Sequence, residues 1–229
     1  MSDLLDPDLF GQASIAFDLD GTLVDTAPDL VRALNAVIVP DGLAPVPVDH
    51  LRALVGRGAQ ALIERAYAQQ GRSLAPEATP ELVARFIEIY QADIAAHSRV
   101  FPEVEATLAR LQRAGATLSV CTNKPSILSD LLIAEFKLSD YFARIIGPDR
   151  TTAKKPAADH VHTALGTGYL RAAMVGDSAP DVDAARAASV PSIVLSYGYS
   201  EAPAGSLGAD RLLHDFGDIP GALAEIWRA

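Results

Sequence analysis

The fold of this chain is decided near its N-terminus by the stretch Ser14-Ile15-Ala16-Phe17-Asp18-Leu19-Asp20-Gly21-Thr22-Leu23. A short apolar run here gives way to two aspartates, a glycine and a threonine. This order is typical of a buried strand in a parallel α/β sheet that delivers polar side chains to a site at its carboxyl end. We therefore expect a strand over residues 14–17 and a ligand-binding site directly after it.

The second half of the chain alternates between strand and helix patterns. Runs of strand type cover residues 117–122, 143–146, 172–175 and 192–195, and the last of these is the last strand that we expect. Helical patterns lie beside them at 104–113, 126–136, 160–165 and 181–188. Such alternation implies right-handed crossovers between parallel strands. The predicted fold class is therefore α/β, with a doubly wound, mostly parallel, Rossmann-like sheet.

The stretch that follows the first strand is helical in its periodicity. Pro28 suits the first turn of a helix, and helical spacing of apolar residues continues, with breaks, to about residue 95. We find no convincing strand between residues 28 and 95. The sequence thus predicts a Rossmann-like catalytic core made of residues 1–25 and 96–229, and a small α-helical domain inserted at residues 26–95.

The composition excludes several classes of protein. Lys and Arg number 19 against 29 Asp and Glu, a net charge of -10, so nucleic acid is not expected as a partner because phosphate backbones are bound by basic clusters. No run approaches the ~18 apolar residues of a membrane helix, and the acidic first ten residues do not resemble a secretory signal. A single cysteine, Cys121, rules out an intrachain disulfide and a thiol-rich zinc site. We expect a cytoplasmic protein that binds no membrane.

Polar side chains of complementary chemistry lie at three of the predicted strand ends. They are Asp18 and Asp20 at the first, Thr122 and Asn123 at the second, and Asp177 with Asp181 at the third, which Lys155 precedes in a loop. Ligands of open α/β sheets bind at the carboxyl ends of strands, where residues distant in sequence meet. Four carboxylates in one crevice repel one another unless a cation joins them, and oxygen ligands without His or Cys favour Mg²⁺. We therefore predict Mg²⁺ as the cofactor.

Four segments of the sequence resemble, in the same order, the motifs of the haloacid-dehalogenase-like hydrolase superfamily. They are Phe17-Asp18-Leu19-Asp20-Gly21-Thr22-Leu23-Val24-Asp25, Thr122-Asn123-Lys124, Lys155-Pro156 and Val175-Gly176-Asp177-Ser178-Ala179-Pro180-Asp181. The helical insert, with Val55-Gly56-Arg57-Gly58-Ala59 and Phe101-Pro102, is most similar to the phosphoglycolate phosphatase branch. The resemblance spans nearly the whole chain and implies that the insert is a cap that closes over the site.

The resemblance implies a role for each carboxylate. Asp18 is implied as the nucleophile that attacks phosphorus and forms an aspartyl-phosphate. Asp20 is implied as the general acid for the leaving alkoxide and then as the base for the hydrolytic water, which requires a proton on its carboxyl at neutral pH. The Asp18 side chain, the Asp20 backbone carbonyl and the Asp177 side chain are implied as the Mg²⁺ ligands.

The resemblance also implies which residues bind the phosphoryl group. Thr122, the Asn123 backbone amide and Lys155 are implied to hold its oxygens, where charge accumulates in the transition state. Lys154 is a rival for Lys155, since a solvated pair is the default for adjacent lysines. Pro156, directly after Lys155, matches the family pattern and favours Lys155.

Three further residues are candidates with open roles. Asp181 is open between positioning Lys155 or a metal-bound water and capping the helix that follows. Arg57 and Gly58 of the insert are substrate-specificity candidates, because an Arg can pair bidentately with a carboxylate. A simple helix break is the alternative for this Gly-Arg-Gly segment.

These residues together predict a Mg²⁺-dependent phosphatase of small phosphomonoesters, with 2-phosphoglycolate as the expected substrate. A sugar-phosphate mutase similar to β-phosphoglucomutase would use the same intermediate, and pyrophosphate or sugar phosphates are alternative substrates. A non-catalytic sensor of phosphorylated metabolites would require a lost nucleophile or acid, whereas both are present. The expected partner is a small phosphorylated metabolite, and the chain is expected to be a monomer or homodimer.

Overall fold

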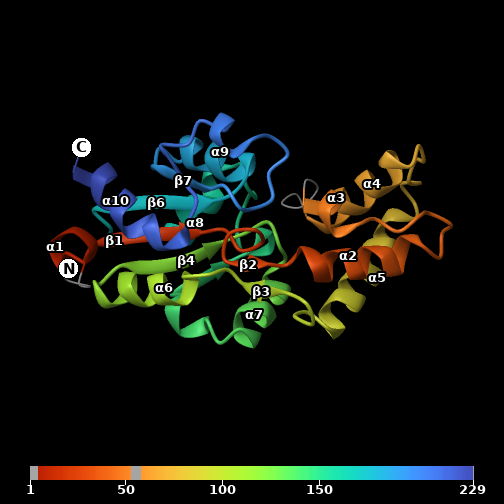
Figure 1. Ribbon diagram of the computed structural model, residues 1–229, viewed down its shortest axis with the longest axis horizontal. Helices are drawn as coiled ribbons and strands as arrows, with labels where there is room; N and C mark the ends of the chain where they lie inside the picture. Colours follow the sequence, from red (N-terminus) through yellow and green to blue (C-terminus); the bar gives the residue numbers. More distant parts are fainter. Residues whose placement is uncertain (1–4, 53–57, 229) are drawn as a thin grey trace.

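A six-stranded parallel sheet forms the centre of the larger part of the molecule (Figure 1). The computed structural model describes residues 5–52 and 58–228. Neighbouring strands follow the order β5-β4-β1-β6-β7-β8, and all of these pairs are parallel. The strands are β1 (Ala13–Phe17), β4 (Thr117–Cys121), β5 (Arg144–Ile146), β6 (Arg171–Gly176), β7 (Ser192–Leu195) and β8 (Arg211–Leu213). The predicted doubly wound α/β class is confirmed.

β1 lies in the middle of this sheet because it is apolar on both faces. All five of its residues are buried. Ile15 and Phe17 belong to one cluster of buried side chains, and Ala16 belongs to another on the opposite face. Successive residues of a strand point to opposite faces, so a continuous apolar run is typical of a parallel strand covered on both sides.

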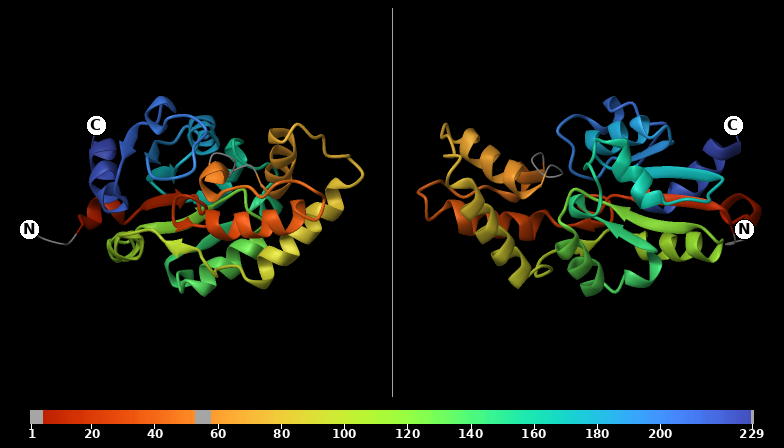
Figure 2. Two further views of the ribbon diagram at one scale, coloured as in Figure 1. Left: turned by 45° about the vertical axis from the view of Figure 1, so that its right-hand side comes forward. Right: turned by 180° about the vertical axis from the view of Figure 1, so that it is seen from behind.

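Helices cover both faces of the sheet, as Figure 2 shows from two further directions. Side chains of α1 (Pro7–Phe10), α6 (Val104–Arg113), α7 (Ser126–Glu135) and α10 (Ile219–Arg228) join the cluster of Ile15 and Phe17. Those of α8 (Ala158–Leu165) and α9 (Ala179–Ala187) join the cluster of Ala16. The described loops also contain 3₁₀ turns at Ser139–Tyr141, Pro148–Arg150, Ala204–Ser206 and Phe216–Asp218. Nowhere in the described ranges does a helix have the length and apolar character needed to cross a membrane.

β8 is an edge strand that the sequence pattern does not reveal. Sequence analysis places the last strand at residues 192–195, which is wrong, because β8 follows it and pairs with β7. β8 has three residues, none of them fully buried. A strand so short and so exposed leaves too little hydrophobic alternation to be recognised.

Helices between residues 27 and 92 form a second packed body, at the right of Figure 1, which we call the helical unit. They are α2 (Ala27–Ile38), α3 (Val48–Arg52), α4 (Ala59–Gln69) and α5 (Thr79–Ala92). Their buried apolar side chains, including Leu34, Ile63 and Phe86, form a core of their own to which α7 contributes Leu128. As expected, the described residues between 28 and 95 include no strand.

Two short strands join the helical unit to the sheet. β2 (Val24–Asp25) and β3 (Arg99–Val100) pair in antiparallel orientation. The buried carboxylate of Asp29 in α2 accepts hydrogen bonds from the backbone N–H groups of His97 (2.9 Å) and Ser98 (2.7 Å). The two crossings of the chain between the two parts therefore lie side by side. Sequence analysis does not predict this ladder, because each strand has only two residues.

Candidate active site

The predicted strand ends meet because β4, β1 and β6 are neighbours in register. Phe17 at the end of β1 lies opposite Val120 of β4 and Val175 of β6. The residues that follow these three positions therefore emerge side by side at one edge of the sheet. Asp18 continues the pairing, since its backbone N–H donates to the carbonyl of Val175 at 2.9 Å.

Three carboxylates converge at this edge. Oxygens of Asp18, Asp177 and Asp181 all lie within 4.8 Å of one another, and the three residues are buried. Burial raises the pKa of Asp18 to about 7 against the opposing effect of Lys155, and burial with the charges of Asp181 and Asp18 raises the pKa of Asp177 well above its ordinary value. Buried like charges are costly without a cation. Because the donors are hard oxygens, this cluster can hold a divalent metal ion.

Lys155 is the cation that the structure places among these carboxylates. Its Nζ lies 2.9 Å from Asp18 Oδ1 and 2.6 Å from Asp181 Oδ1, and the residue is only 2% exposed. Burial opposes its charge, but the two aspartates outweigh burial and raise the pKa of Lys155. The neighbouring Lys154 is exposed, so the geometry favours Lys155 over its rival.

His160 fixes the backbone of Lys155, a role that sequence reasoning missed. The backbone N–H of Lys155 donates to Nδ1 of His160 at 3.0 Å. Because Nδ1 accepts, the ring is neutral and Nε2 carries the hydrogen that points to the Ile146 carbonyl, 3.0 Å away. Burial lowers the pKa of His160 to about 4, which agrees with a neutral ring. The only sequence clue is the position of His160, five residues after Lys155.

Asp181 makes both a helix-capping contact and a contact with Lys155, the two alternatives between which the sequence leaves it open. Its Oδ2 accepts from the backbone N–H of Ser178 at 3.0 Å and from the Ser178 hydroxyl at 2.8 Å, as part of a capping box at the start of α9. Its Oδ1 accepts from Lys155 Nζ. A helix N-cap thus holds the carboxylate in place while the other oxygen orients the lysine.

The side chain of Asp20 points away from the carboxylate cluster. It accepts a hydrogen bond from the Thr26 hydroxyl at 2.7 Å, and its two oxygens lie 3.0 and 3.3 Å from Nζ of Lys124. This arrangement is compatible with a metal contact through the Asp20 backbone carbonyl rather than its carboxylate. Lys124 is a site residue that sequence reasoning missed, although it is the third residue of the Thr122-Asn123-Lys124 motif and one of four lysines in the chain.

Thr122 and Asn123 lie on the β4 side of the same edge. Thr122 is buried, and its hydroxyl accepts from the backbone N–H of Lys124 at 3.2 Å. The side-chain amide of Asn123 donates to the backbone carbonyl of Lys155 at 3.2 Å. The second and third predicted motifs are therefore linked directly.

Asp177 is held by residues from outside its own motif. Its Oδ1 accepts from the Thr22 hydroxyl at 3.2 Å, and its Oδ2 accepts from the backbone N–H of Tyr199, which follows β7. Gly21 has a φ of 86°, and a Cβ there would lie 2.5 Å from Asp177 Oδ2 and 2.9 Å from the Tyr199 ring. Only glycine fits this close approach. Sequence analysis does not predict Tyr199, because nothing in the sequence shows where its loop returns.

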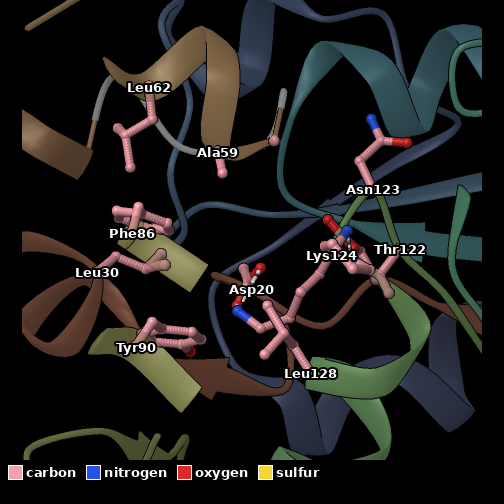
Figure 3. A pocket seen from close by; sticks show the side chains of 13 residues that line it. Asp20, Leu30, Ala59, Leu62, Phe86, Tyr90, Thr122, Asn123, Lys124 and Leu128 are labelled. Carbon is pink, nitrogen blue, oxygen red and sulfur yellow. Dashed lines mark hydrogen bonds and ion pairs between the residues drawn. The ribbon is translucent and has the colours of Figure 1, made fainter. Parts of the chain in front are cut away.

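A cavity of about 40 Å³ lies between the carboxylate edge and the helical unit (Figure 3). From the sheet side it is lined by Asp18, Asp20, Thr122, Asn123, Lys124, Pro125 and Leu128. From the helical unit it is lined by Leu30, Gly58, Ala59, Leu62, Phe86 and Tyr90. The cavity therefore has a polar side, which carries the predicted motif residues, and a mainly apolar side.

Of the two specificity candidates in the insert, Gly58 is at the cavity. It precedes α4 with a φ of 94°, and a Cβ at this position would lie 3.8 Å from the Asn123 carbonyl oxygen. The helical unit thus approaches the second motif closely at Gly58. Arg57 lies outside the described residues.

Comparison with known proteins gives a family whose members share the segments that meet at this site. The family model of haloacid dehalogenase-like hydrolases matches residues 15–195, which include all four motifs. The chain belongs to the haloacid dehalogenase-like hydrolase family. It is therefore an enzyme of the hydrolase class, as the sequence predicts.

Relatives within the haloacid dehalogenase-like hydrolases confirm the predicted branch. A phosphoglycolate phosphatase of Caulobacter vibrioides is 50% identical over 213 residues, or 92% of this chain and 90% of the relative. A phosphoglycolate phosphatase of Agrobacterium fabrum is 44% identical over 212 residues, 91% of each chain. Among solved structures, CbbY of Rhodobacter sphaeroides in complex with phosphate is 28% identical with a TM-score of 0.76, covering 92% of this chain and 98% of that one.

Proposed function

We propose that this hydrolase is a Mg²⁺-dependent phosphatase of small phosphomonoesters and that its substrate is 2-phosphoglycolate. The observation that carries the proposal is the buried Asp18 carboxylate, 2.9 Å from Lys155 Nζ and adjacent to Asp177. An anionic nucleophile beside a fixed cation is the pairing that transfer of a phosphoryl group requires. The choice of substrate is supported by the names of relatives that are up to 50% identical.

Asp18 attacks the phosphoryl group, and Lys155 stabilises its charge. In the first step an oxygen of Asp18 forms a bond to phosphorus while the bond from phosphorus to the ester oxygen breaks, which leaves an aspartyl-phosphate. Lys155, Thr122 and the Asn123 backbone amide face the oxygens of the transferred group and stabilise its charge. Because Asp181 and His160 fix Lys155 from two sides, the ammonium needs little reorganisation during the reaction.

Asp20 moves the protons. Its carboxyl lines the cavity beside Asp18, where it gives a proton to the leaving alkoxide. It then takes a proton from the water that attacks phosphorus in the second step, when the bond between phosphorus and Asp18 breaks and phosphate leaves. The Thr26 hydroxyl, 2.7 Å from Asp20 Oδ1, orients this carboxyl.

Asp18, Asp177 and the backbone carbonyl of Asp20 would hold the Mg²⁺. The fit rests on the oxygen-only donor set and on the cost of burying three carboxylates that share the single ammonium of Lys155. When bound, the ion supplies positive charge that offsets the carboxylates and the phosphoryl oxygens. Asp181 is committed to Lys155 and to the helix N-terminus, so we assign it to positioning.

We assign residues 26–95 as a cap that covers the site. Leu30, Leu62 and Phe86 present apolar surface to the cavity from this segment. Apolar cover excludes water and so protects the aspartyl-phosphate from competing reactions. The boundary at 26 and 95 agrees with the paired crossings of the chain at β2 and β3.

The test is the release of phosphate from 2-phosphoglycolate by the wild-type protein and by Asp18→Asn. We expect steady release in Mg²⁺ that a chelator stops, and loss of turnover in Asp18→Asn with an unchanged melting temperature or a higher one, since a buried charge is removed. Near-wild-type turnover by Asp18→Asn would refute the nucleophile. A sugar-phosphate mutase would instead need a hexose bisphosphate and release phosphate slowly, and a sensor would release none.

A further inference from the structure

Lys124 has no part in the mechanism above, yet it is the second buried ammonium at the cavity. It follows β4, is 6% exposed and lines the cavity. Burial opposes its charge, but Asp20 outweighs burial and raises the pKa of Lys124, so the side chain is cationic. Figure 3 shows its ammonium directed toward Asp20 and the helical unit, away from Asn123.

Tyr90 of α5 faces this ammonium from the helical unit. Nζ of Lys124 lies 4.4 Å from the centroid of the Tyr90 ring, a distance typical of cation–π contacts. The Tyr90 hydroxyl is fully buried and makes no hydrogen bond of regular geometry among the described residues, and the Lys124 ammonium is the polar group that lies close enough to interact with it. A buried hydroxyl that is incompletely hydrogen-bonded is costly, and this one belongs to a residue that lines the cavity.

Among the described residues, the rest of the lining from the helical unit is glycine or apolar. Leu30, Leu62 and Phe86 are apolar, as is Leu128 from α7. The Lys155 ammonium is paired with Asp18 and Asp181, and we assign it to binding of the phosphoryl group. On the side of the cavity that faces the helical unit, a ligand beside Asp20 therefore meets the Lys124 ammonium and the Tyr90 hydroxyl among described side chains that are otherwise apolar.

We propose that Lys124 and Tyr90 determine specificity by binding a carboxylate on the leaving group of the substrate. A carboxylate bonded directly to the ester carbon, as in 2-phosphoglycolate, would accept charge-assisted hydrogen bonds from the Lys124 ammonium and the Tyr90 hydroxyl. Lys124 would then exchange part of its contact with Asp20 for the substrate. This inference rests on the proposed function, because it names the group that distinguishes the substrate from other small phosphate esters.

The test compares 2-phosphoglycolate with ethyl phosphate, which has a methyl group in place of the carboxylate. We expect wild type to favour 2-phosphoglycolate in kcat/KM, and Lys124→Met to reduce this preference about 10- to 100-fold, the range of a hydrogen bond to a charged group. Tyr90→Phe keeps the ring and should reduce the preference less. Lys124→Arg should restore part of it. Lys137→Met, at an exposed lysine, is the matched control.

The ratio of kcat/KM for 2-phosphoglycolate to kcat/KM for ethyl phosphate separates binding of the carboxylate from the effect of Lys124 on Asp20. An equal loss of kcat/KM for both substrates would overturn the proposal, because it would show that Lys124 acts through Asp20 alone. If Lys124→Met does not fold, the same preference can be measured with Tyr90→Phe, because that variant changes no charge.

Binding to Asp18→Asn separates this inference from the proposed function. Absence of turnover of 2-phosphoglycolate by wild type would refute the proposed substrate. Lys124→Met, added to the Asp18→Asn protein, should still weaken the binding of 2-phosphoglycolate in calorimetry about 10-fold or more relative to the binding of ethyl phosphate. Equal weakening of both ligands would overturn the role of Lys124.

Discussion

Lys155 lies between two buried carboxylates, with Nζ 2.9 Å from Asp18 and 2.6 Å from Asp181. An ammonium in this position offsets negative charge that three aspartates would otherwise bring together without compensation. Two groups outside the reaction keep it there, the carboxylate of Asp181 and the imidazole of His160. Each can be altered without removing the lysine itself.

Asp181→Asn should separate the two roles of this residue. The Asn oxygen can still accept from the backbone N–H of Ser178, but the charge that holds Lys155 is lost. We expect kcat for 2-phosphoglycolate to fall about 10-fold or more. Ser178→Ala is the matched control: loss of part of the capping box should lower the free energy of unfolding by about 1 kcal/mol with a smaller effect on kcat. Equal effects of both variants on kcat would contradict a separate Asp181–Lys155 role.

His160 predicts a pH dependence of stability. Its pKa is about 4 in the folded protein against 6.5 as the ordinary value, so the unfolded chain binds the proton more tightly. Stability from this residue is present above pH 6.5 and is lost as the pH falls toward 4, by at most about 1.4 kcal/mol per pH unit. Urea unfolding between pH 4 and 7 should show a steeper loss in wild type than in His160→Gln. Parallel curves would contradict the assignment.

At the scale of elements, the order of strands explains what the sequence could and could not predict. Asp18, Asp177 and Thr122 could be placed because each ends a strand of a parallel sheet, and such ends share one edge. Tyr199 and His160 could not, because a loop and a helix bring them to the site from directions that no local pattern encodes. The same limit applies to β2, β3 and β8, which are too short for a periodicity to be read.

The cluster of Asp18, Asp177 and Asp181 is assembled from β1, β6 and α9, so a bound cation should fasten these elements together. At about 100 times its Kd, Mg²⁺ should add about 2.7 kcal/mol to the free energy of unfolding, which raises the melting temperature by roughly 5 to 10 °C. Asp177→Asn should lose this response. In chelator the variant should melt at or above wild type, because one buried charge is gone. An undiminished Mg²⁺ response in Asp177→Asn would contradict the proposed ligand.

At the scale of the whole molecule, the sheet and the helical unit share the cavity, and apolar side chains of the helical unit border the space beside Asp20. We expect these side chains to restrict a bulky leaving group such as a sugar more than a short one. One methylene that does not fit changes selectivity by about 10- to 200-fold. We therefore expect kcat/KM for glucose 6-phosphate to be at least about 100-fold below that for 2-phosphoglycolate.

Leu30→Ala provides the companion measurement for this size limit. Removing a buried side chain that lines the cavity from α2 should narrow the difference between the two esters, at a cost of about 2–5 kcal/mol in stability. Comparable turnover of both esters by wild type would show that the cavity does not select by size.

The antiparallel ladder of β2 and β3 has a consequence for how such a molecule can be rebuilt. Val24 pairs with Val100 and Asp25 with Arg99, which is the arrangement of two strands that a two-residue turn can connect. We therefore expect that residues 26–98 can be exchanged as one unit, for a tight turn or for a different insert, with the order of the sheet unchanged. Selection or design can in this way give the same carboxylate cluster a new cover in a single recombination event.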